Sequence, residues 1–278
     1  MKHIFLNLKR FDIPKELAGV NSIAPPAQWG KYIVEQIQEP LERYRGEDVE
    51  FAVFFPEAHI LPAAAALKQD SMVQLGCQGI HREDTEKGKN FGAFTSSRTG
   101  NAMKALGCAA VMIGHCEERA DKAGIMAEAG CTDASAVNRI LNREILAAQK
   151  AGLKVLYCIG EKAEEQERWQ EVLEEQLKTG LEGTDASGIT IAYEPVWAIG
   201  PGKIPPDGEY MEKIGAFVKK VTGGMDVVYG GGLKTDNAEL VASVPDLDGG
   251  LIALTRFQGE IGFYPEEYLE IIEKYMGR

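Results

Sequence analysis

Short apolar runs alternate along the chain with longer stretches in which apolar residues recur every three or four positions. Most of the short runs are bounded by Gly, Pro or polar residues, and several are almost continuously apolar. This pattern is typical of parallel strands that are covered on both faces. The predicted strands are His3–Leu8, Phe51–Phe55, Met72–Cys77, Ala109–Ile113, Leu153–Cys158, Ile189–Tyr193, Met225–Tyr229 and Gly249–Leu254.

The longer stretches have the period of amphipathic helices, most clearly over Ser135–Ala151. We expect Asp133 or Thr132 to cap that helix, and Asp207 to begin another, because short polar side chains favour helix N-termini. The other predicted helices are Trp29–Arg43, Thr99–Leu106, Glu164–Lys178, Gly208–Val221, Asn237–Ser243, Glu266–Tyr275 and a short Ala-rich segment, Leu61–Leu67.

Eight strands alternating with about eight helices can close into a (β/α)8 barrel, a fold of about 250 residues. The periodicity also allows an open doubly wound sheet, but neither GxGxxG nor GxxxxGK[ST] follows the first strand, which disfavours the nucleotide-binding forms of that fold. No linker, low-complexity tract or shift in composition marks a boundary. We therefore expect a single α/β domain over residues 1–278.

The composition narrows the possible partners. The chain has 30 Lys and Arg against 42 Asp and Glu, a formal charge of −12, which argues against nonspecific nucleic-acid binding. No apolar run approaches the roughly 20 residues that span a bilayer, and no secretory signal is visible. The five cysteines, none in CxxC spacing, indicate reduced cytoplasmic thiols, and the four scattered histidines form no metal-binding pattern. We expect no cofactor.

In a (β/α)8 barrel, reactive side chains follow the C-terminal ends of the strands. Lys9, His115 and Glu194 come after the first, fourth and sixth predicted strands, and Gly230–Gly232 after the seventh. A carboxylate can remove a carbon-bound proton, while an imidazole and an ammonium group stabilise the resulting enediolate. Glycine-rich turns can hold an anion. Each residue alone also has a structural interpretation, but their joint placement at strand ends favours proton transfer beside a carbonyl.

Three segments carry a family resemblance: AYEPVWAIG over Ala192–Gly200, IGHCE over Ile113–Glu117 and NLK over Asn7–Lys9. In these, and in their order along essentially the whole chain, the sequence resembles the triosephosphate isomerase family, whose fold is the TIM barrel. The resemblance implies cofactor-free isomerisation of a small sugar phosphate, glyceraldehyde 3-phosphate to dihydroxyacetone phosphate by default. It further implies a role in glycolysis and gluconeogenesis and a homodimer.

The resemblance also assigns roles. Glu194 would be the base and His115 the neutral electrophile, a pairing established for this family, with Lys9 as the third catalytic residue. Glu117, Trp197 and Tyr229 would support the site, and a lid would run through Ala198–Gly202. The residues expected to bind substrate are Asn7, Lys9, Gly200, Gly231, Gly232 and Arg256.

Several positions depart from the family pattern. Cys116 replaces a serine, Pro201 stiffens the lid, and Gly232 replaces the serine after the seventh strand. After the eighth strand, Ala253–Leu254 replaces two glycines that bind phosphate, and ten residues intervene before Pro265. We expect Arg256, in that insertion, to supply a bidentate phosphate contact instead.

A charged pair of the family's interface loops is also changed, because Ser97 and Glu118 replace a glutamate and an arginine. Arg98 is expected to pair with Glu118 in reversed polarity. Two alternatives to the default function remain. One is isomerisation of another short ketose phosphate, such as a tetrulose phosphate, and the other is a non-catalytic metabolite-binding barrel. The complete set of Asn7, Lys9, His115 and Glu194 counts against the latter.

Overall fold

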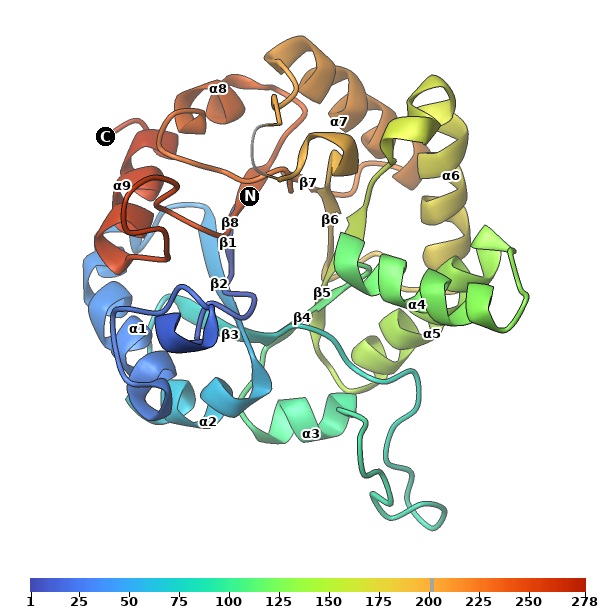
Figure 1. Ribbon diagram of the computed structural model, residues 1–278, viewed down its shortest axis with the longest axis horizontal. Coiled ribbons are helices and arrows are strands. Elements are labelled where there is room, and N and C mark those ends of the chain that lie inside the picture. The colour runs from blue at the N-terminus through green and yellow to red at the C-terminus, as the bar shows by residue number, and fades with distance from the viewer. Residues whose placement is uncertain (201–202) are drawn as a thin grey trace.

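The computed structural model describes residues 1–200 and 203–278, and its parallel strands close into one barrel in chain order (Figure 1). β1 pairs with both β2 and β8, which closes the ring. The predicted (β/α)8 fold is confirmed. The strands are β1 Lys2–Asn7, β2 Val49–Phe55, β3 Val73–Cys77, β4 Ala110–Ile113, β5 Lys154–Ile159, β6 Ile189–Tyr193, β7 Val227–Tyr229 and β8 Gly249–Ile252.

Helices surround the barrel, and all predicted ones are present with shifted ends. They are α1 Pro26–Leu41, α2 Glu57–Ala66, α3 Gly100–Ala105, α4 Cys116–Glu128, α5 Ala134–Lys150, α6 Trp169–Gly180, α7 Gly208–Thr222, α8 Ala238–Ser243 and α9 Pro265–Tyr275. The short 3-10 helices are η1 Lys15–Leu17, η2 Glu42–Tyr44, η3 Ala163–Arg168 and η4 Val196–Ala198.

One helix, α4, was absent from the sequence prediction. The structure describes all of α4, and none of its residues is buried, so it lacks the apolar stripe from which amphipathic helices are predicted. Its first turn instead carries Glu117 and Glu118, which favour a helix N-terminus electrostatically. The helix matters because its N-cap is His115.

The caps predicted from polar residues are confirmed for two helices. The Asp133 side chain accepts a hydrogen bond from the Ser135 backbone N–H at the start of α5. Asp207 does the same for the Tyr210 N–H at the start of α7. Such a cap contributes about 1 kcal/mol to helix stability.

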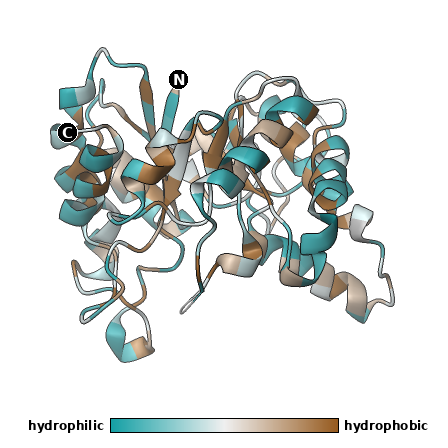
Figure 2. Cartoon of the chain, turned by 90° about the horizontal axis from the view of Figure 1, so that it is seen from above, coloured by the Kyte–Doolittle hydropathy of each residue, from teal (hydrophilic) through white to brown (hydrophobic). Residues whose placement is uncertain are grey.

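The apolar side chains form two layers, as the near-continuous apolar strands predict. Alternate strand residues fill the barrel interior, and the others pack against the helices around it. Figure 2 shows the hydrophobic residues concentrated on the strands and the hydrophilic ones on the surrounding helices. The interior layer consists of Phe5, Ala52, Phe54, Ala110, Met112, Leu156, Cys158, Ala192, Val228 and Leu251. This filled interior holds the strand ends rigidly in place.

Two connections extend beyond the barrel. The segment between β3 and α3 projects away from the body of the molecule (Figure 1), and within this segment Phe91 is 85% exposed. After β8, the chain turns back on itself through an antiparallel bridge between Arg256 and Gly262 before α9 begins at Pro265. No helix in the described part of the chain is long and apolar enough to span a membrane.

Candidate active site

Glu194 and His115 meet at the C-terminal end of the barrel. Glu194 directly follows β6 and is 2% exposed, and its Oε1 lies 3.1 Å from His115 Nε2. Its second oxygen, Oε2, accepts a hydrogen bond from the Cys116 backbone N–H at 2.9 Å. Burial raises the pKa of Glu194 above its usual 4.5, although the His115 and Cys116 contacts oppose the rise. A buried carboxylate with a raised pKa is a stronger base than an exposed one.

Two glycines allow the backbone around Glu194 to pack this closely. A Cβ at Gly160, after β5, would overlap the carbonyl oxygen of Glu194. A Cβ at Gly230, after β7, would lie 2.8 Å from the Tyr193 carbonyl oxygen and 2.9 Å from Glu194 Cγ. Both neighbouring strand ends must therefore lack a side chain for the carboxylate to be held between them.

The imidazole of His115 is oriented by the helix that it caps. Its Nδ1 accepts a hydrogen bond from the Glu117 backbone N–H at 3.3 Å. In the neutral ring, the hydrogen is therefore assigned to Nε2, which faces Glu194. The side chain is 12% exposed, so one edge of the ring is open to an incoming molecule. This tautomer presents an N–H donor at the place where the carboxylate lies.

Arg119, one turn into α4, fixes the backbone that carries His115. Its guanidinium donates to the carbonyl oxygens of Gly114 and Cys158, and to the Asn138 side chain on α5. It therefore ties the end of β4 to the end of β5. Sequence reasoning missed Arg119, since an arginine in an unpredicted helix gives no signal of burial.

Lys9 and Asn7 follow β1 and are held in a strained turn. Lys9 has a positive φ of 40°, and its backbone N–H donates to Asn7 Oδ1 at 3.0 Å. Gln78 donates to the Lys9 carbonyl oxygen at 3.1 Å and lies 3.3 Å from Asn7 Oδ1. The Lys9 ammonium lies 3.8 Å from a carboxylate oxygen of Glu117. Gln78 was missed, although it directly follows β3 and the strand-end rule applies to it too.

Trp197, at the start of the expected lid, is anchored through a buried glutamate that sequence reasoning did not select. Its indole N–H donates to Glu161 Oε1 at 2.8 Å. The hydroxyl groups of Tyr193 and Tyr210 lie 2.9 and 3.1 Å from the same oxygen. Glu161 is fully buried, and burial raises its pKa while the three donors lower it. Gly200 lies further along this loop with a φ of 123°, whereas Pro201 and Gly202 fall outside the described residues.

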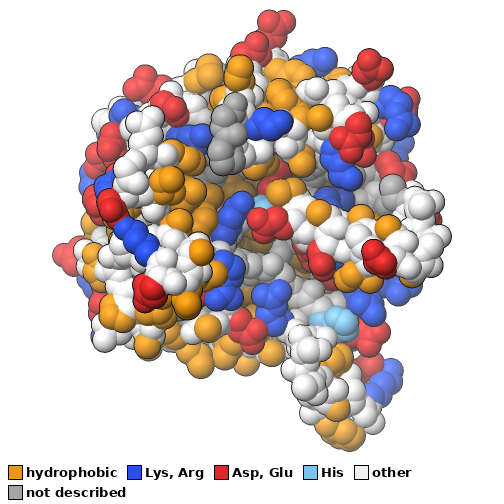
Figure 3. Space-filling model, viewed as in Figure 1, with side chains coloured by type: hydrophobic (Ala, Val, Ile, Leu, Met, Phe, Trp, Pro, Cys, Tyr) orange, Lys and Arg blue, Asp and Glu red, His pale blue; other side chains and the backbone are white. Residues whose placement is uncertain are grey.

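The glycine-rich turn after β7 faces the same end of the barrel. Gly232 has a φ of 98°, which favours glycine, and a Cβ added there would lie 3.6 Å from Lys234 Cε. Gly231 packs against the Tyr229 ring. The Tyr229 hydroxyl is buried and has no hydrogen-bond partner among the described residues. Figure 3 shows this end of the barrel hollowed at its centre and bordered by Lys and Arg side chains.

Arg256 is engaged by acidic side chains of α9. Its Nε and one terminal nitrogen each lie 2.6 Å from Glu267 Oε1, and its guanidinium stacks on Tyr264 at 3.7 Å from the ring centroid. Glu266 lies 3.9 Å away. One edge of the guanidinium is thus taken up by a carboxylate, so a bidentate phosphate contact has to use the other edge.

The expected pairing of Arg98 with Glu118 is wrong within this chain. Glu118 accepts a hydrogen bond from the Gly114 backbone N–H at 2.6 Å and pairs with Lys122 one turn along α4 at 2.8 Å. Because α4 was not predicted, this i,i+4 partner could not be foreseen.

The strand ends also assemble a metal-ligand set that sequence spacing did not show. His115, Cys116 and Glu194 each place one potential ligand atom within 4.8 Å of the other two. Burial raises the pKa of the Cys116 thiol to about 12, and the Glu194 carboxylate adds to that rise. His115 and Cys116 are adjacent, but Glu194 is distant in sequence, so the spacing of histidines and cysteines alone does not show this set.

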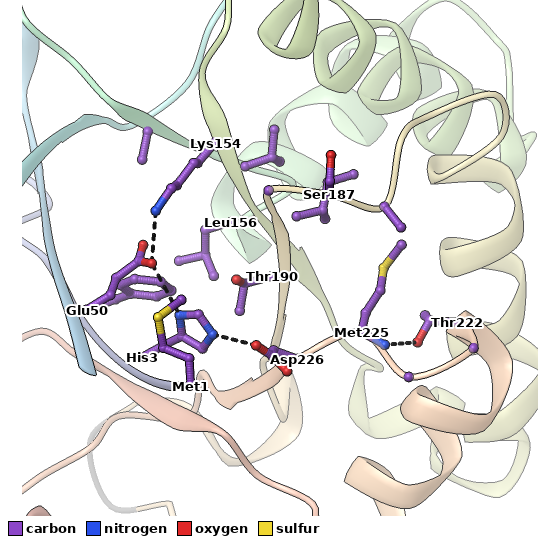
Figure 4. A pocket seen from close by; sticks show the side chains of 18 of the residues that line it. Met1, His3, Glu50, Lys154, Leu156, Ser187, Thr190, Thr222, Met225 and Asp226 are labelled. Carbon is purple, nitrogen blue, oxygen red and sulfur yellow. Dashed lines mark hydrogen bonds and ion pairs between the residues drawn. The ribbon is translucent and has the colours of Figure 1, made fainter. Parts of the chain in front are cut away.

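A cavity lies at the opposite end of the barrel (Figure 4). Its volume is about 520 Å³, and it is lined by residues at or just before the N-terminal ends of the strands, including His3, Glu50 and Asp226. His3 Nε2 lies 2.8 Å from Asp226, and Lys154 pairs with Glu50 at 3.0 Å. In this fold the N-terminal end serves stability, so the presence of a cavity there does not identify the reactive site.

Comparison with known proteins agrees with the geometry. The family model described as triosephosphate isomerase matches residues 27–274. The triosephosphate isomerase of Syntrophotalea carbinolica is 33% identical over 77% of this chain and 80% of its own length. That of Geobacter metallireducens is 36% identical over 74% of this chain and 79% of its own length.

A solved structure supports the fold independently. The triosephosphate isomerase from Bartonella henselae superposes with a TM-score of 0.72 at 23% sequence identity, covering 99% of both chains. The matched barrel, together with relatives above 30% identity over most of the chain, identifies the family. The chain belongs to the triosephosphate isomerase family of aldose–ketose isomerases.

Proposed function

We propose that this protein interconverts glyceraldehyde 3-phosphate and dihydroxyacetone phosphate without a cofactor, and thereby serves glycolysis and gluconeogenesis. The observation that carries the proposal is the 3.1 Å approach of the buried Glu194 carboxylate to His115 Nε2. It brings a base and an N–H donor together at the same end of the barrel. Isomerisation through an enediolate requires those two groups and no redox partner.

In the proposed reaction, Glu194 removes a proton from one carbon of the substrate and returns it to the neighbouring carbon. His115 donates its Nε2 hydrogen toward the carbonyl oxygen, and the Lys9 ammonium stabilises the negative charge that develops there. Because Glu194 and His115 are in direct contact here, a substrate has to separate them. The carboxylate then leaves the Cys116 N–H and loses a hydrogen bond, which strengthens it as a base.

The far end of the substrate would be held by backbone N–H groups and cations at the mouth. We propose that Gly200, Gly231 and Gly232 present backbone donors to the phosphate, with Asn7 beside Lys9. Arg256 would approach with the guanidinium edge that Glu267 does not occupy. Glu117 and Trp197 would support the site by holding Lys9 and the loop after β6, and Tyr229 would hold that loop when it closes.

The connection after β8 favours a second candidate substrate. A short antiparallel turn stabilised by the Arg256–Gly262 bridge occupies the region between β8 and α9, and Ala253–Leu254 stands in place of two glycines. A change in the position at which the phosphate binds alters the length of substrate that can reach Glu194 and His115. A tetrulose phosphate is therefore the alternative.

We further propose that residues 1–278 form one domain and that the protein is a cytoplasmic homodimer. The projecting segment between β3 and α3 supports the dimer, because it extends away from the barrel and carries an exposed aromatic side chain, Phe91, that a partner subunit can cover. The free thiols of Cys77, Cys108, Cys116, Cys131 and Cys158 support a reducing compartment. Light scattering after size-exclusion chromatography tests the dimer, and Phe91→Asp should weaken it.

Steady-state assays with both triose phosphates and with tetrulose phosphates test the activity. We expect the highest kcat/KM with the triose phosphates, whereas a higher value with a tetrulose phosphate would favour the alternative substrate. Glu194→Gln should lose nearly all activity. Arg256→Ala should raise KM more than it lowers kcat, whereas the matched control Arg168→Ala, on an exposed arginine, should change neither. If no phosphorylated ketose is turned over, the proposed function is wrong and the non-catalytic barrel is favoured.

A further inference from the structure

We infer that His115, Cys116 and Glu194 form a zinc-binding site whose occupation blocks catalysis. The three residues supply nitrogen, sulfur and oxygen, the ligand types that Zn²⁺ prefers. His115 and Cys116 lie together where β4 leads into α4, and Glu194 follows β6, so the barrel fixes the backbone of all three. This property goes beyond isomerisation and depends on the cysteine at position 116.

The His115 and Glu194 ligand atoms are close to the spacing that a tetrahedral ion requires. Zinc bonds of about 2.0–2.3 Å place tetrahedral ligand atoms about 3.3–3.6 Å apart. Here His115 Nε2 lies 3.1 Å from Glu194 Oε1 and 4.0 Å from Cys116 Sγ. Cys116 Sγ also lies 3.8 Å from His115 Nδ1, so the sulfur is beside the ring, and rotation of the Cys116 side chain is needed to bring all three atoms around one ion. His115 and Cys116 are both partly exposed, which leaves the fourth position accessible to water.

Binding requires two protonation changes that the site can accommodate. The Cys116 thiol releases its proton to solvent, and the His115 hydrogen moves from Nε2 to Nδ1. Once Nδ1 carries the hydrogen, it can no longer accept the hydrogen bond from the Glu117 backbone N–H, which is long at 3.3 Å. The Nδ1–H group can instead donate to the Glu117 carboxylate, which lies 3.8 Å away. A carboxylate behind a metal-bound histidine is the usual outer partner in zinc sites.

Zinc at this site would inhibit the isomerase, because it would bind the two atoms that carry out the proton transfer. Zinc would occupy both the Glu194 oxygen that removes the proton and the His115 nitrogen that donates to the carbonyl. Lys9 is the cation that opposes binding, and its ammonium is directed to Glu117 at 3.8 Å. Inhibition should therefore be competitive with substrate and reversible by a chelator.

Inhibition by buffered Zn²⁺ tests the inference, with each rate divided by the metal-free rate of the same variant. Losing an outer partner alone typically weakens metal binding about 10–100-fold, so Cys116→Ser should raise the inhibition constant at least tenfold. The control Cys131→Ser, on an exposed cysteine, should match the parent protein. Equal sensitivity of the parent and Cys116→Ser would overturn the inference.

Co²⁺ provides a readout that does not depend on activity, so it separates this inference from the proposed function. The parent protein should develop a thiolate-to-cobalt charge-transfer band that Zn²⁺ displaces. Cys131→Ser should keep the band, Cys116→Ser should lose it, and Glu194→Gln should weaken Co²⁺ binding. A band that persists in Cys116→Ser, or none in the parent protein, contradicts the site even if the isomerase activity is as proposed.

Discussion

Two buried glutamates at the ends of adjacent strands have opposite surroundings. Glu161 after β5 and Glu194 after β6 are 0% and 2% exposed, and burial raises the pKa of both. One oxygen of Glu161 is surrounded by three donors on Tyr193, Trp197 and Tyr210. Glu194 has one backbone donor and one imidazole. Burial alone therefore does not make a catalytic base.

The two carboxylates differ in how easily each can leave its hydrogen-bond donors. The donors of Glu161 are bulky side chains from β6, η4 and α7, so moving this carboxylate would disturb three elements at once. Glu194 can leave a single N–H group for a substrate without disturbing the fold. A carboxylate that joins elements contributes to stability, and one that is held by few partners remains available for chemistry.

The largest expected effect is on activity in Glu194→Gln. The amide cannot take a proton, so kcat should fall by about 10²–10⁴-fold, the usual contribution of general acid–base catalysis. Kinetics with both triose phosphates measure it. A variant retaining more than a tenth of the activity would show that another group is the base.

Glu194→Gln should also reveal a cost to stability. A raised pKa in the folded state means that the folded protein binds this proton more tightly than the unfolded chain. The contribution of Glu194 is therefore most favourable below the unfolded pKa and declines as pH rises through the folded value, which lies above 4.5. Urea unfolding should show the parent protein losing stability relative to Glu194→Gln across that range. A difference independent of pH would contradict this linkage.

The raised pKa predicts the acid limb of the rate profile. Because the base must be ionised, kcat/KM should fall tenfold per pH unit below the pKa of Glu194 in the free enzyme. The midpoint should lie above the usual 4.5 of a glutamate. Rates measured from acid to neutral pH with corrected ionic strength test this, and a midpoint at or below 4.5 would mean that burial does not control the base.

The matching change at the other carboxylate should act mainly on stability. Glu161→Leu keeps the side-chain volume but leaves three donors without their acceptor. The expected loss is about 1–3 kcal/mol in the free energy of unfolding, measured in urea. Activity should fall less than in Glu194→Gln, through a displaced Trp197. A loss of activity greater than that of Glu194→Gln would contradict the assignment of Glu161 to stability and of Glu194 to catalysis.

The smallest expected effect tests one donor of the Glu161 cluster. Tyr210→Phe removes a hydroxyl that lies 3.1 Å from Glu161 Oε1, and should cost about 0.5–1.5 kcal/mol. In a Glu161→Leu background the same change should cost almost nothing, because the acceptor is already gone. An unchanged cost in that background would show that the Tyr210 hydroxyl acts through a partner other than Glu161.

The sequence by itself determined the alternation of strands and helices, the barrel and the positions of Lys9, His115 and Glu194 at strand ends. Strand periodicity and local caps depend on near neighbours, so they are visible in the order of residues. Helix α4 was missed because its residues remain partly or fully exposed and leave no apolar stripe.

Tertiary structure alone decided which polar groups meet. Glu161 collects donors from residues up to 49 positions away, and Cys116 and Glu194 are 78 positions apart. The pairing of Arg256 with Glu267 likewise depends on how the chain turns after β8. Contacts of this kind depend on the closure of the barrel, which brings strand ends together irrespective of their separation in sequence.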